Sequence, residues 1–259
     1  MIGRVRTDVR LPTRRETEAG WHRVVAVARA QWALLLLLVV GGGVFALAVA
    51  GSAEVYDDVQ DRDEIAGLDQ PVLDAAVDLR TPALDAFVTG YTDLGGIVWA
   101  PLLTTLLVVG LALLWRSWTP VVLMLVATAG SLTMTAVGKV VVARDRPDLA
   151  LAVPPFEDSP AFPSGHALNA AVIAGVLAYL LVLRTRSVPV GVVAGALAVV
   201  HAVLMGLSRV YLGHHWLTDV LVAWFLGAAW LALVVVVHQL VLRRLAHRSA
   251  RRQDARHAG

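Results

Sequence analysis

The sequence contains no cysteine, which excludes disulfide bonds, zinc–thiolate sites, iron–sulfur clusters and a cysteine nucleophile. Charged residues are also scarce, since they make up 16% of the 259 residues, whereas about 25% is usual in a soluble domain. Hydrophobic residues reach 58%, against about 45–50% in such domains. This composition argues against a disordered chain and against a soluble globular domain, and it favours one bundle of membrane-spanning helices.

Long stretches without Asp, Glu, Lys or Arg predict where the chain crosses a membrane. A helix needs about 20 apolar residues to cross a bilayer. The stretches of that length are 30–53, 94–115, 117–138, 159–183, 187–208 and 220–242. The fourth begins inside a polar loop, so its helix is expected to start near Ser164. We therefore predict an all-α, polytopic membrane protein with six transmembrane helices, in which residues 30–242 form one domain between basic tails at 1–29 and 243–259.

The formal net charge is only +2, but the charges are strongly segregated along the chain. Basic residues dominate both tails and the connections at Arg116 and Arg184, whereas the segment 52–93 is acidic. Basic residues thus fall on alternate connections. The positive-inside rule then places both termini in the cytoplasm and the segments 52–93 and 139–163 outside, in a multi-pass protein of the cell membrane.

The first span resembles a signal peptide, because Ala48-Val49-Ala50 is similar to a cleavage site. Both the preceding basic tail and the apolar run are long for a signal peptide, so we expect an uncleaved anchor. Cleavage would leave the other five spans oriented as before.

The acidic segment 52–93 is expected to have two parts. Residues 54–69 lack hydrophobic periodicity and are typical of a solvated loop. Residues 72–93 show a rough amphipathic pattern that Pro82 interrupts, which predicts a hairpin of two interfacial helices. This hairpin would lie either on the outer membrane surface or over the helical bundle.

Polar residues of several spans are predicted to meet at the outer membrane face. Such groups are costly in a membrane bundle and are usually functional. The residues are Lys139, Arg144, Arg146, Ser164, Gly165, His166, Arg209, His214, His215 and Asp219. Cations that face one cavity repel each other unless an anion binds between them, although each alone could extend to lipid head groups. We interpret the group as a candidate anion-binding site.

The spacing of Lys139, Arg146 and Ser164 supports this interpretation. Lys139 and Arg146 are seven residues apart and share a helical face if the helix continues, but Pro147 disfavours helix at Arg146 and lets it turn inward. Ser164 is expected to cap the next helix, whose free N–H groups favour an anion, and Gly165 allows close approach of a ligand. A capped helix start followed by a surface histidine is the alternative.

His215 and Asp219 are four residues apart and therefore lie on one helical face. A carboxylate at that position fixes the tautomer of the imidazole and leaves the other ring nitrogen as nucleophile or base, although a purely structural pair has the same spacing. His214 is expected to point elsewhere. His201 is expected to be packed or hydrogen-bonded between helices, and His238 to lie far from the group.

The motifs Lys139-x6-Arg146-Pro147, Pro163-Ser164-Gly165-His166 and Ser208-Arg209-x5-His215-x3-Asp219 occur in this order. In order and spacing the chain resembles the type 2 phosphatidic acid phosphatase superfamily, the lipid phosphate phosphatases that are related to vanadium haloperoxidases. The motifs cover residues 139–219, and the six spans are similar to those of its membrane branch. The resemblance implies the helical bundle core of that family. Residues 1–29, 52–70 and 243–259 carry no diagnostic pattern.

The resemblance also implies a mechanism. His215 would attack phosphorus and form a phosphohistidine, Asp219 would orient His215, and His166 would protonate the leaving oxygen and later activate water. The groups that would bind the phosphoryl oxygens are Lys139, Arg146, Ser164, Gly165 and Arg209. Because these cations take the part that Mg²⁺ plays in other phosphoryl-transfer enzymes, hydrolysis without a metal or cofactor is implied. Arg144 and Asp145 are lesser candidates inside the first motif.

The expected substrate is a lipid phosphate or diphosphate whose chains stay in the bilayer. Similar bacterial proteins act on undecaprenyl diphosphate, phosphatidylglycerophosphate or phosphatidic acid. We favour undecaprenyl diphosphate, because a site at the outer face suits recycling of a cell-wall carrier lipid. The basic C-terminal tail is expected to set the topology and contact anionic lipid rather than bind nucleic acid. The oligomeric state is left open.

Three other functions remain compatible with the sequence. The same phosphohistidine could pass to a lipid acceptor, which would make the protein a lipid phosphotransferase. A transporter or scrambler could use the basic cavity only to bind lipid phosphate, although no internal repeat of the kind found in transporters is evident. An inactive family member could serve as a scaffold, although its motifs are intact.

Overall fold

The computed structural model describes residues 14–61 and 65–257. In this part the chain forms α-helices and short 3₁₀ turns and has no strand, so the all-α prediction is confirmed. The chain divides into two compact units. The described part of the first is residues 14–40, which belong to α1 (Arg14–Asp61), and the second begins at Gly41.

Five described helices are long and apolar enough to cross a membrane. They are Leu34–Asp61 of α1, α5 (Thr119–Val142), α6 (Gly165–Thr185), α7 (Val188–Tyr211) and Leu217–Ala246 of α8 (Leu217–His257). The apolar α4 (Trp99–Trp115) is shorter. These six helices correspond to the six predicted spans, and α6 begins next to Ser164, as expected.

The second predicted span starts later than its apolar run does. The run begins at residue 94, but α4 begins at Trp99. Before it, the backbone N–H groups of Gly95 and Gly96 donate to Thr92 and Asp93 and close a turn. Apolar composition alone did not reveal this turn.

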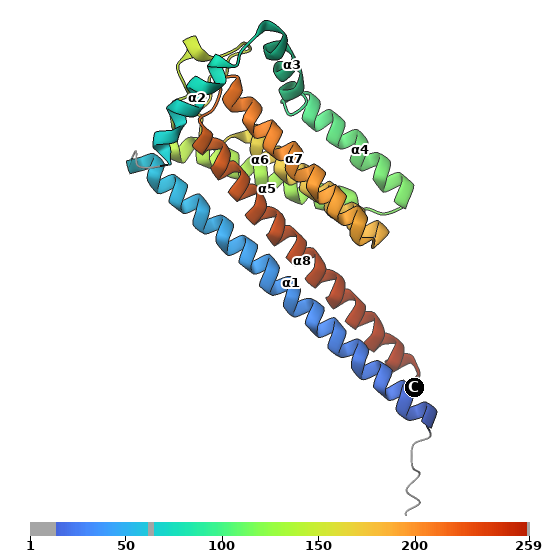
Figure 1. The fold of residues 1–259 in the computed structure, drawn as a ribbon. Coiled ribbons are helices and arrows are strands. Elements are labelled where there is room, and N and C mark those ends of the chain that lie inside the picture. Colours follow the sequence, from blue (N-terminus) through green and yellow to red (C-terminus); the bar gives the residue numbers. More distant parts are fainter. Residues whose placement is uncertain (1–13, 62–64, 258–259) are drawn as a thin grey trace, which may run out of the picture. The chain divides into compact units, whose positions relative to one another are not determined.

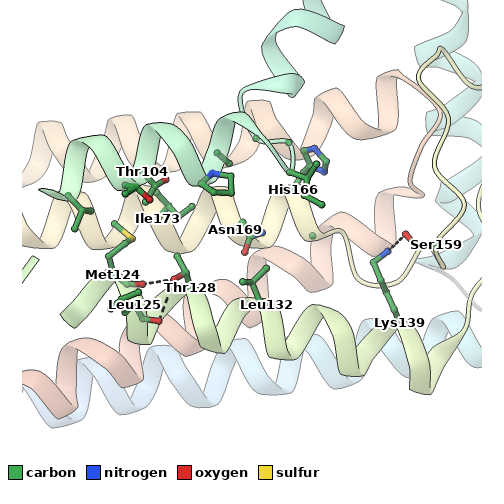
Figure 2. A pocket seen from close by; sticks show the side chains of 18 of the residues that line it. Thr104, Met124, Leu125, Thr128, Leu132, Lys139, Ser159, His166, Asn169 and Ile173 are labelled. Atoms are coloured by element: carbon green, nitrogen blue, oxygen red, sulfur yellow. Dashed lines mark hydrogen bonds between the residues drawn. The ribbon is translucent and has the colours of Figure 1, made fainter. Parts of the chain in front are cut away.

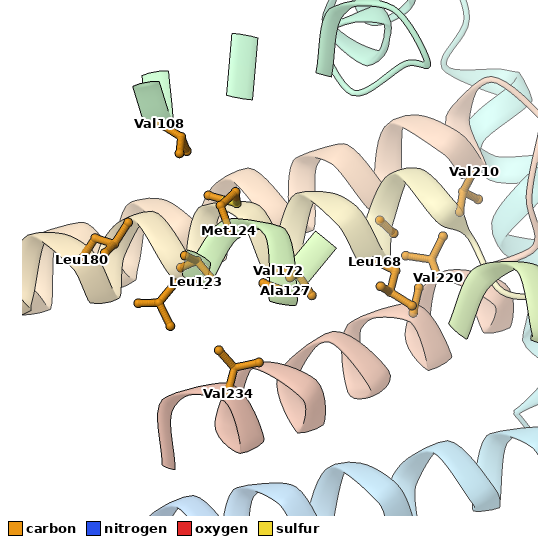
Figure 3. Close-up of a cluster of buried hydrophobic side chains, with 13 residues drawn as sticks. Val108, Leu123, Met124, Ala127, Leu168, Val172, Leu180, Val210, Val220 and Val234 are labelled. Carbon is orange, nitrogen blue, oxygen red and sulfur yellow. The ribbon is translucent and has the colours of Figure 1, made fainter. Parts of the chain in front are cut away.

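Helix α6 is the centre of the bundle in the second unit. It packs most extensively against α7 and also against α8 and α5 (Figure 1). Figure 3 shows the buried side chains between them, among which Leu168, Val172 and Val220 are inaccessible. The outer faces carry exposed apolar side chains such as Val140, which suits contact with lipid. Because lipid is itself apolar, the bundle is stabilised by van der Waals packing and interhelical hydrogen bonds.

One close approach joins α8 to α5. The indole N–H of Trp230 donates to the Ala127 carbonyl at 2.9 Å. A β-carbon added at Gly130 would overlap the Trp230 ring. Glycine at this position therefore allows the ring to lie against the α5 backbone, as small residues do in membrane bundles.

Helix α1 extends further than predicted. Residues 54–61 are helical, which corrects the prediction that a solvated loop begins at residue 54. Val55 is buried against Phe162 and Val222. Tyr56 and Val59 pack on the same cluster, and their contacts stabilise the helix beyond the end of the apolar run.

The predicted hairpin is confirmed as α2 (Asp69–Asp78) and α3 (Pro82–Asp93). Pro82 lies in the first turn of α3, where its missing N–H costs nothing, and the Thr81 hydroxyl accepts a hydrogen bond from the Leu84 N–H at 3.2 Å. The hairpin contacts α7 and α8, and Leu73 is fully buried. Of the two predicted placements, these contacts support the one over the bundle.

We predict that Gly130→Ala destabilises the protein, although alanine is the better helix former. The new β-carbon displaces the Trp230 ring, and overpacking of this kind costs about 1–3 kcal/mol. Gly110→Ala is the matched control, because a β-carbon added at Gly110 would meet no packed neighbour within 4 Å. Thermal unfolding midpoints in detergent should fall only for Gly130→Ala. Equal midpoints for the two variants would contradict the close packing.

Candidate active site

Four helices and two connections carry the predicted site residues to one end of the bundle. Lys139 lies in the last turn of α5, Arg209 in the last turn of α7, and Asp219 in the first turn of α8. The remaining predicted residues come from the loop 143–164, the start of α6 and the turn 212–216, and they are Arg146, Ser164, Gly165, His166 and His215. We call this end of the bundle the site end.

The turn that carries His215 is fixed by its backbone. Gly213 adopts φ +72°, and a β-carbon there would overlap the Leu151 carbonyl. The N–H groups of His214 and His215 both point to the Arg209 carbonyl, at 3.0 and 3.3 Å. Arg80 donates to the neighbouring carbonyls of Leu151 and Tyr211, at 2.6 Å each. The turn is therefore held from α7 and from the hairpin.

His215 is buried and lies between a carboxylate and a guanidinium. Its Nδ1 is 3.5 Å from Oδ2 of Asp219, and its Nε2 is 3.4 Å from Nη1 of Arg146. Because arginine only donates hydrogen bonds, Nε2 carries the lone pair and Nδ1 carries the proton that faces Asp219. Burial and the charges of Arg146 and Arg209 lower the pKa of His215 well below its usual value. The lowered pKa favours the neutral ring, and the arginine beside Nε2 favours a lone pair on that nitrogen.

The three predicted phosphate-binding cations all bind the loop that precedes α6. Lys139 donates to the Ser159 hydroxyl at 3.0 Å and to the Pro160 carbonyl. The Nε of Arg146 donates to the Ser159 carbonyl at 2.6 Å. Together with Arg209, these side chains converge on residues 157–160, so the structure brings the predicted cations together.

Glu157 is a residue of this site that the sequence did not reveal. One carboxylate oxygen pairs with Arg146 at 2.7 Å, and the other pairs with Arg209. Burial alone would raise the pKa of Glu157, but the two arginines outweigh it and lower that pKa to about 2. The expected repulsion between the cations pointed to an anion between them, and the chain itself supplies one.

Ser164 differs from its predicted role. It precedes α6, but its side chain makes no capping hydrogen bond. Its backbone N–H donates to the Asp219 carbonyl at 3.1 Å, and the residue is fully buried. Within the described residues, the Ser164 hydroxyl and Nε of Arg209 lack a hydrogen-bond partner. Both are buried polar atoms that could bind a ligand oxygen.

A cavity of about 450 Å³ extends from the site end into the bundle. Lys139, His166 and His215 line its polar end, while α4 and α5 supply apolar residues such as Val108 and Met124. Figure 2 shows Lys139 and Ser159 at one side of the view and Met124 and Thr104 at the other. The cavity therefore joins a charged region to an apolar one.

The other histidines behave as expected. His214 points away from Asp219, and its Nε2 is 2.7 Å from the Val153 carbonyl. His201 is hydrogen-bonded to the Tyr91 hydroxyl at 3.0 Å. His238 is hydrogen-bonded to the Tyr179 hydroxyl at 2.8 Å, in the middle of α8. These three residues have structural partners rather than a place in the cavity.

Comparisons with known proteins show the family to which the chain belongs. The family model of the PAP2 superfamily matches residues 120–243. Phosphatidylglycerophosphatase B of Bacillus subtilis (strain 168) is 38% identical over 164 residues, which cover 61% of this chain and 77% of that protein. The chain belongs to the PAP2 superfamily. The resemblance noted in the sequence is thereby confirmed, and this PAP2 protein is a member of a family of membrane phosphatases.

Two solved structures have the same fold. The crystal structure of a transmembrane PAP2-type phosphatidylglycerolphosphate phosphatase from Bacillus subtilis is 31% identical, with a TM-score of 0.65. The match covers 78% of this chain and 96% of that one. LpxE of Aquifex aeolicus is 22% identical and shares the fold, with a TM-score of 0.52, over 65% of this chain and 94% of that one. The prediction of a polytopic helical bundle is confirmed.

We predict that His214 and His215 of this PAP2 protein stay neutral in mildly acidic solution. Burial, followed by the charge of Arg209, lowers the pKa of His214 to about 4, and that of His215 is also low. A histidine with a lowered pKa takes up its proton only when the pH falls below that value. Nitrogen-15 spectra of labelled histidine, assigned with His214→Gln, should show two neutral rings from pH 7.5 to 5.5. In the denatured protein the same rings should titrate near pH 6.5. If the ring of His214 or His215 titrated near pH 6.5 in the folded protein, the predicted effect of burial would be contradicted.

Proposed function

We propose that this protein hydrolyses lipid phosphates through a phosphohistidine on His215. The observation that carries the proposal is the buried His215, which lines the polar end of the cavity together with Lys139 and whose Nε2 is 3.4 Å from Nη1 of Arg146. In the first step Nε2 bonds to phosphorus, the bond from phosphorus to the leaving oxygen breaks, and His166 protonates that oxygen. In the second step His166 takes a proton from water, the water oxygen bonds to phosphorus, and the nitrogen–phosphorus bond breaks.

Asp219 supports both steps from the other side of the ring. It faces the Nδ1–H of His215 and stabilises the positive charge that the ring gains when Nε2 bonds to phosphorus. The phosphoryl oxygens would bind Lys139, Arg146, Arg209, the Ser164 hydroxyl and the Gly165 N–H. The free Ser164 hydroxyl and the free Nε of Arg209 support this assignment.

The charge of the transition state is offset by side chains in this proposal, so no metal ion is required. Lys139, Arg146 and Arg209 together carry the positive charge that Mg²⁺ supplies in many phosphoryl-transfer enzymes. In the described part of the chain, no three His, Asp or Glu side chains are grouped so that they could hold a metal ion. The donor set therefore favours anion binding.

The form of the cavity supports a lipid substrate. Its apolar part between α4 and α5 suits a hydrocarbon chain, while its polar end suits a phosphate head group. We place phosphatidylglycerophosphate first, because a relative that is 38% identical is named phosphatidylglycerophosphatase B. Undecaprenyl diphosphate, which the sequence favoured, and phosphatidic acid are the other candidates. The segregated charges support cytoplasmic termini and a site at the outer face.

The decisive experiment measures phosphate release by the purified protein in detergent with EDTA present. The substrates are phosphatidylglycerophosphate, undecaprenyl diphosphate and phosphatidic acid. His215→Ala should lower the release more than about a thousandfold, because it removes the nucleophile. His238→Ala is the control histidine, since His238 lies on α8 and bonds to Tyr179 away from the site. Labelled phosphate should appear on the wild-type protein in an acid-labile form.

Several results would contradict parts of this proposal. Activity that EDTA abolishes and Mg²⁺ restores would overturn metal independence. Label that passes to an added lipid instead of water would show a phosphotransferase. Lipid movement that persists in His215→Ala, without hydrolysis in the wild type, would show a transporter or scrambler.

Glu157 offers a separate test of the phosphate position. A phosphoryl group that binds Arg146 and Arg209 must displace the carboxylate that now pairs with both. We predict that Glu157→Gln strengthens inhibition by inorganic phosphate about two- to fivefold, as loss of roughly 0.5–1 kcal/mol of competition implies. Steady-state inhibition kinetics measure this change. Weaker inhibition would instead show that Glu157 holds the arginines in place for phosphate.

A further inference from the structure

Asp69 reaches the first turn of α8 from a different part of the chain. It is the first residue of α2 and is 4% exposed. Its Oδ1 accepts the Thr218 N–H at 2.9 Å, and its Oδ2 accepts the Thr218 hydroxyl at 2.7 Å. A carboxylate at a helix N-terminus satisfies free N–H groups and interacts favourably with the helix dipole. Asp69 thus caps the helical turn that carries Asp219.

Arg144 connects Asp69 to Asp219. Its Nη2 pairs with Asp69 at 2.7 Å, and its Nη1 pairs with Asp219 at 2.7 Å. Nη1 also donates to the Thr218 hydroxyl at 2.7 Å, and the guanidinium lies 5.6 Å from the centre of the Trp216 ring. The planar fork of arginine suits this bridge, because one group binds two carboxylates in a fixed geometry.

These contacts fix the direction in which Asp219 faces. Its Oδ1 accepts from Arg144, while its Oδ2 accepts the Trp216 N–H at 2.9 Å and faces Nδ1 of His215. Asp219 is fully buried, and a buried carboxylate requires a counter-charge. Arg144 supplies that charge at Oδ1, whereas His215 lies beside Oδ2.

We propose that Asp69 and Arg144 are positioning residues for the phosphoryl-transfer reaction. This inference rests on the proposed function. Asp69 orients Arg144, Arg144 orients Asp219, and Asp219 holds the reactive tautomer of His215. The two carboxylates outnumber the one guanidinium, so the group has an excess negative charge. The imidazole becomes positive when its Nε2 bonds to phosphorus, and this excess charge then stabilises it.

Asp69→Asn tests whether Asp69 positions Arg144 for the reaction. The amide keeps the size of the side chain and an oxygen for the Thr218 N–H, but it removes the charge that orients Arg144. We expect kcat to fall about 10- to 100-fold, as is typical for groups that orient a reacting residue. KM and inhibition by inorganic phosphate should not change, because Lys139, Arg146 and Arg209 keep their contacts. Asp74→Asn is the control on the same helix, since Asp74 is exposed and pairs only with Gln70 among the described contacts.

Substitutions of Arg144 give a second, independent test. Arg144→Lys keeps the charge but not the fork, and it should recover part of the kcat that Arg144→Met loses. Adding Asp69→Asn to Arg144→Met should lower kcat little further, because Asp69 acts through Arg144. If Asp69→Asn does not fold, the pair of Arg144 variants still decides the question. Nitrogen-15 spectra should show that His215 loses its preference for the Nδ1–H tautomer in Arg144→Met.

The outcomes separate this inference from the proposed function. If the wild type is active and His215→Ala is inactive, but the Asp69 and Arg144 variants keep the wild-type kcat, the positioning role is wrong and the function stands. A purely structural bridge would lower the unfolding midpoint of the variants and leave kcat per folded molecule and the His215 tautomer unchanged. If the folded wild type releases no phosphate from any substrate, the proposed function itself fails.

Discussion

Repulsion between like charges in a confined space is the constraint that organises the site end. Lys139, Arg146 and Arg209 meet in a partly buried region, where water screens their charges poorly. The loop before α6 offsets their charges with the carboxylate of Glu157, and its backbone and hydroxyl oxygens accept hydrogen bonds from them. Around Asp219, which faces the other ring nitrogen of His215, the charges are reversed, because there one cation, Arg144, lies between two carboxylates. His215 therefore lies between a group of cations and a group with two carboxylates, an arrangement that suits the proposed phosphohistidine, in which the ring would gain positive charge.

The parts of this arrangement differ in how far the sequence foretells them. His215 and Asp219 are one helical turn apart, so their proximity follows from helix geometry alone. Lys139 and Arg209 are basic residues at the face that the positive-inside rule places outside the membrane, and this exception to the rule marks them as unusual. Glu157 gives no such signal, because a single acidic residue in a polar loop resembles any solvated side chain. Asp69 lies in a segment without a motif, and only the tertiary fold shows that it meets α8, 149 residues further along the chain.

The hairpin of α2 and α3 does more than shield the end of the bundle. Besides Asp69, it contributes Thr92, whose hydroxyl accepts from Nη1 of Arg209 at 3.1 Å, and Arg80, which binds the backbone beside the His215 turn. The segment thus contacts groups on both sides of His215. An amphipathic pattern predicts that such a hairpin covers something, but it does not reveal which of its polar residues face inward. The interior polar contacts are made by residues that look like ordinary surface residues in the sequence.

The short helix α4 has a consequence for the surrounding lipid. Its 17 residues span about 26 Å, whereas the hydrocarbon core of a bilayer is about 30 Å thick. A helix shorter than the hydrocarbon core is commonly accommodated by local thinning of the bilayer, and α4 also lines the cavity. Thinning of this kind would bring the phosphate of a neighbouring lipid closer to the level of the proposed site before any protein movement. Under the proposed function, turnover in vesicles would then depend on acyl-chain length through the thickness of the membrane itself, as well as through the fit of the chain in the cavity.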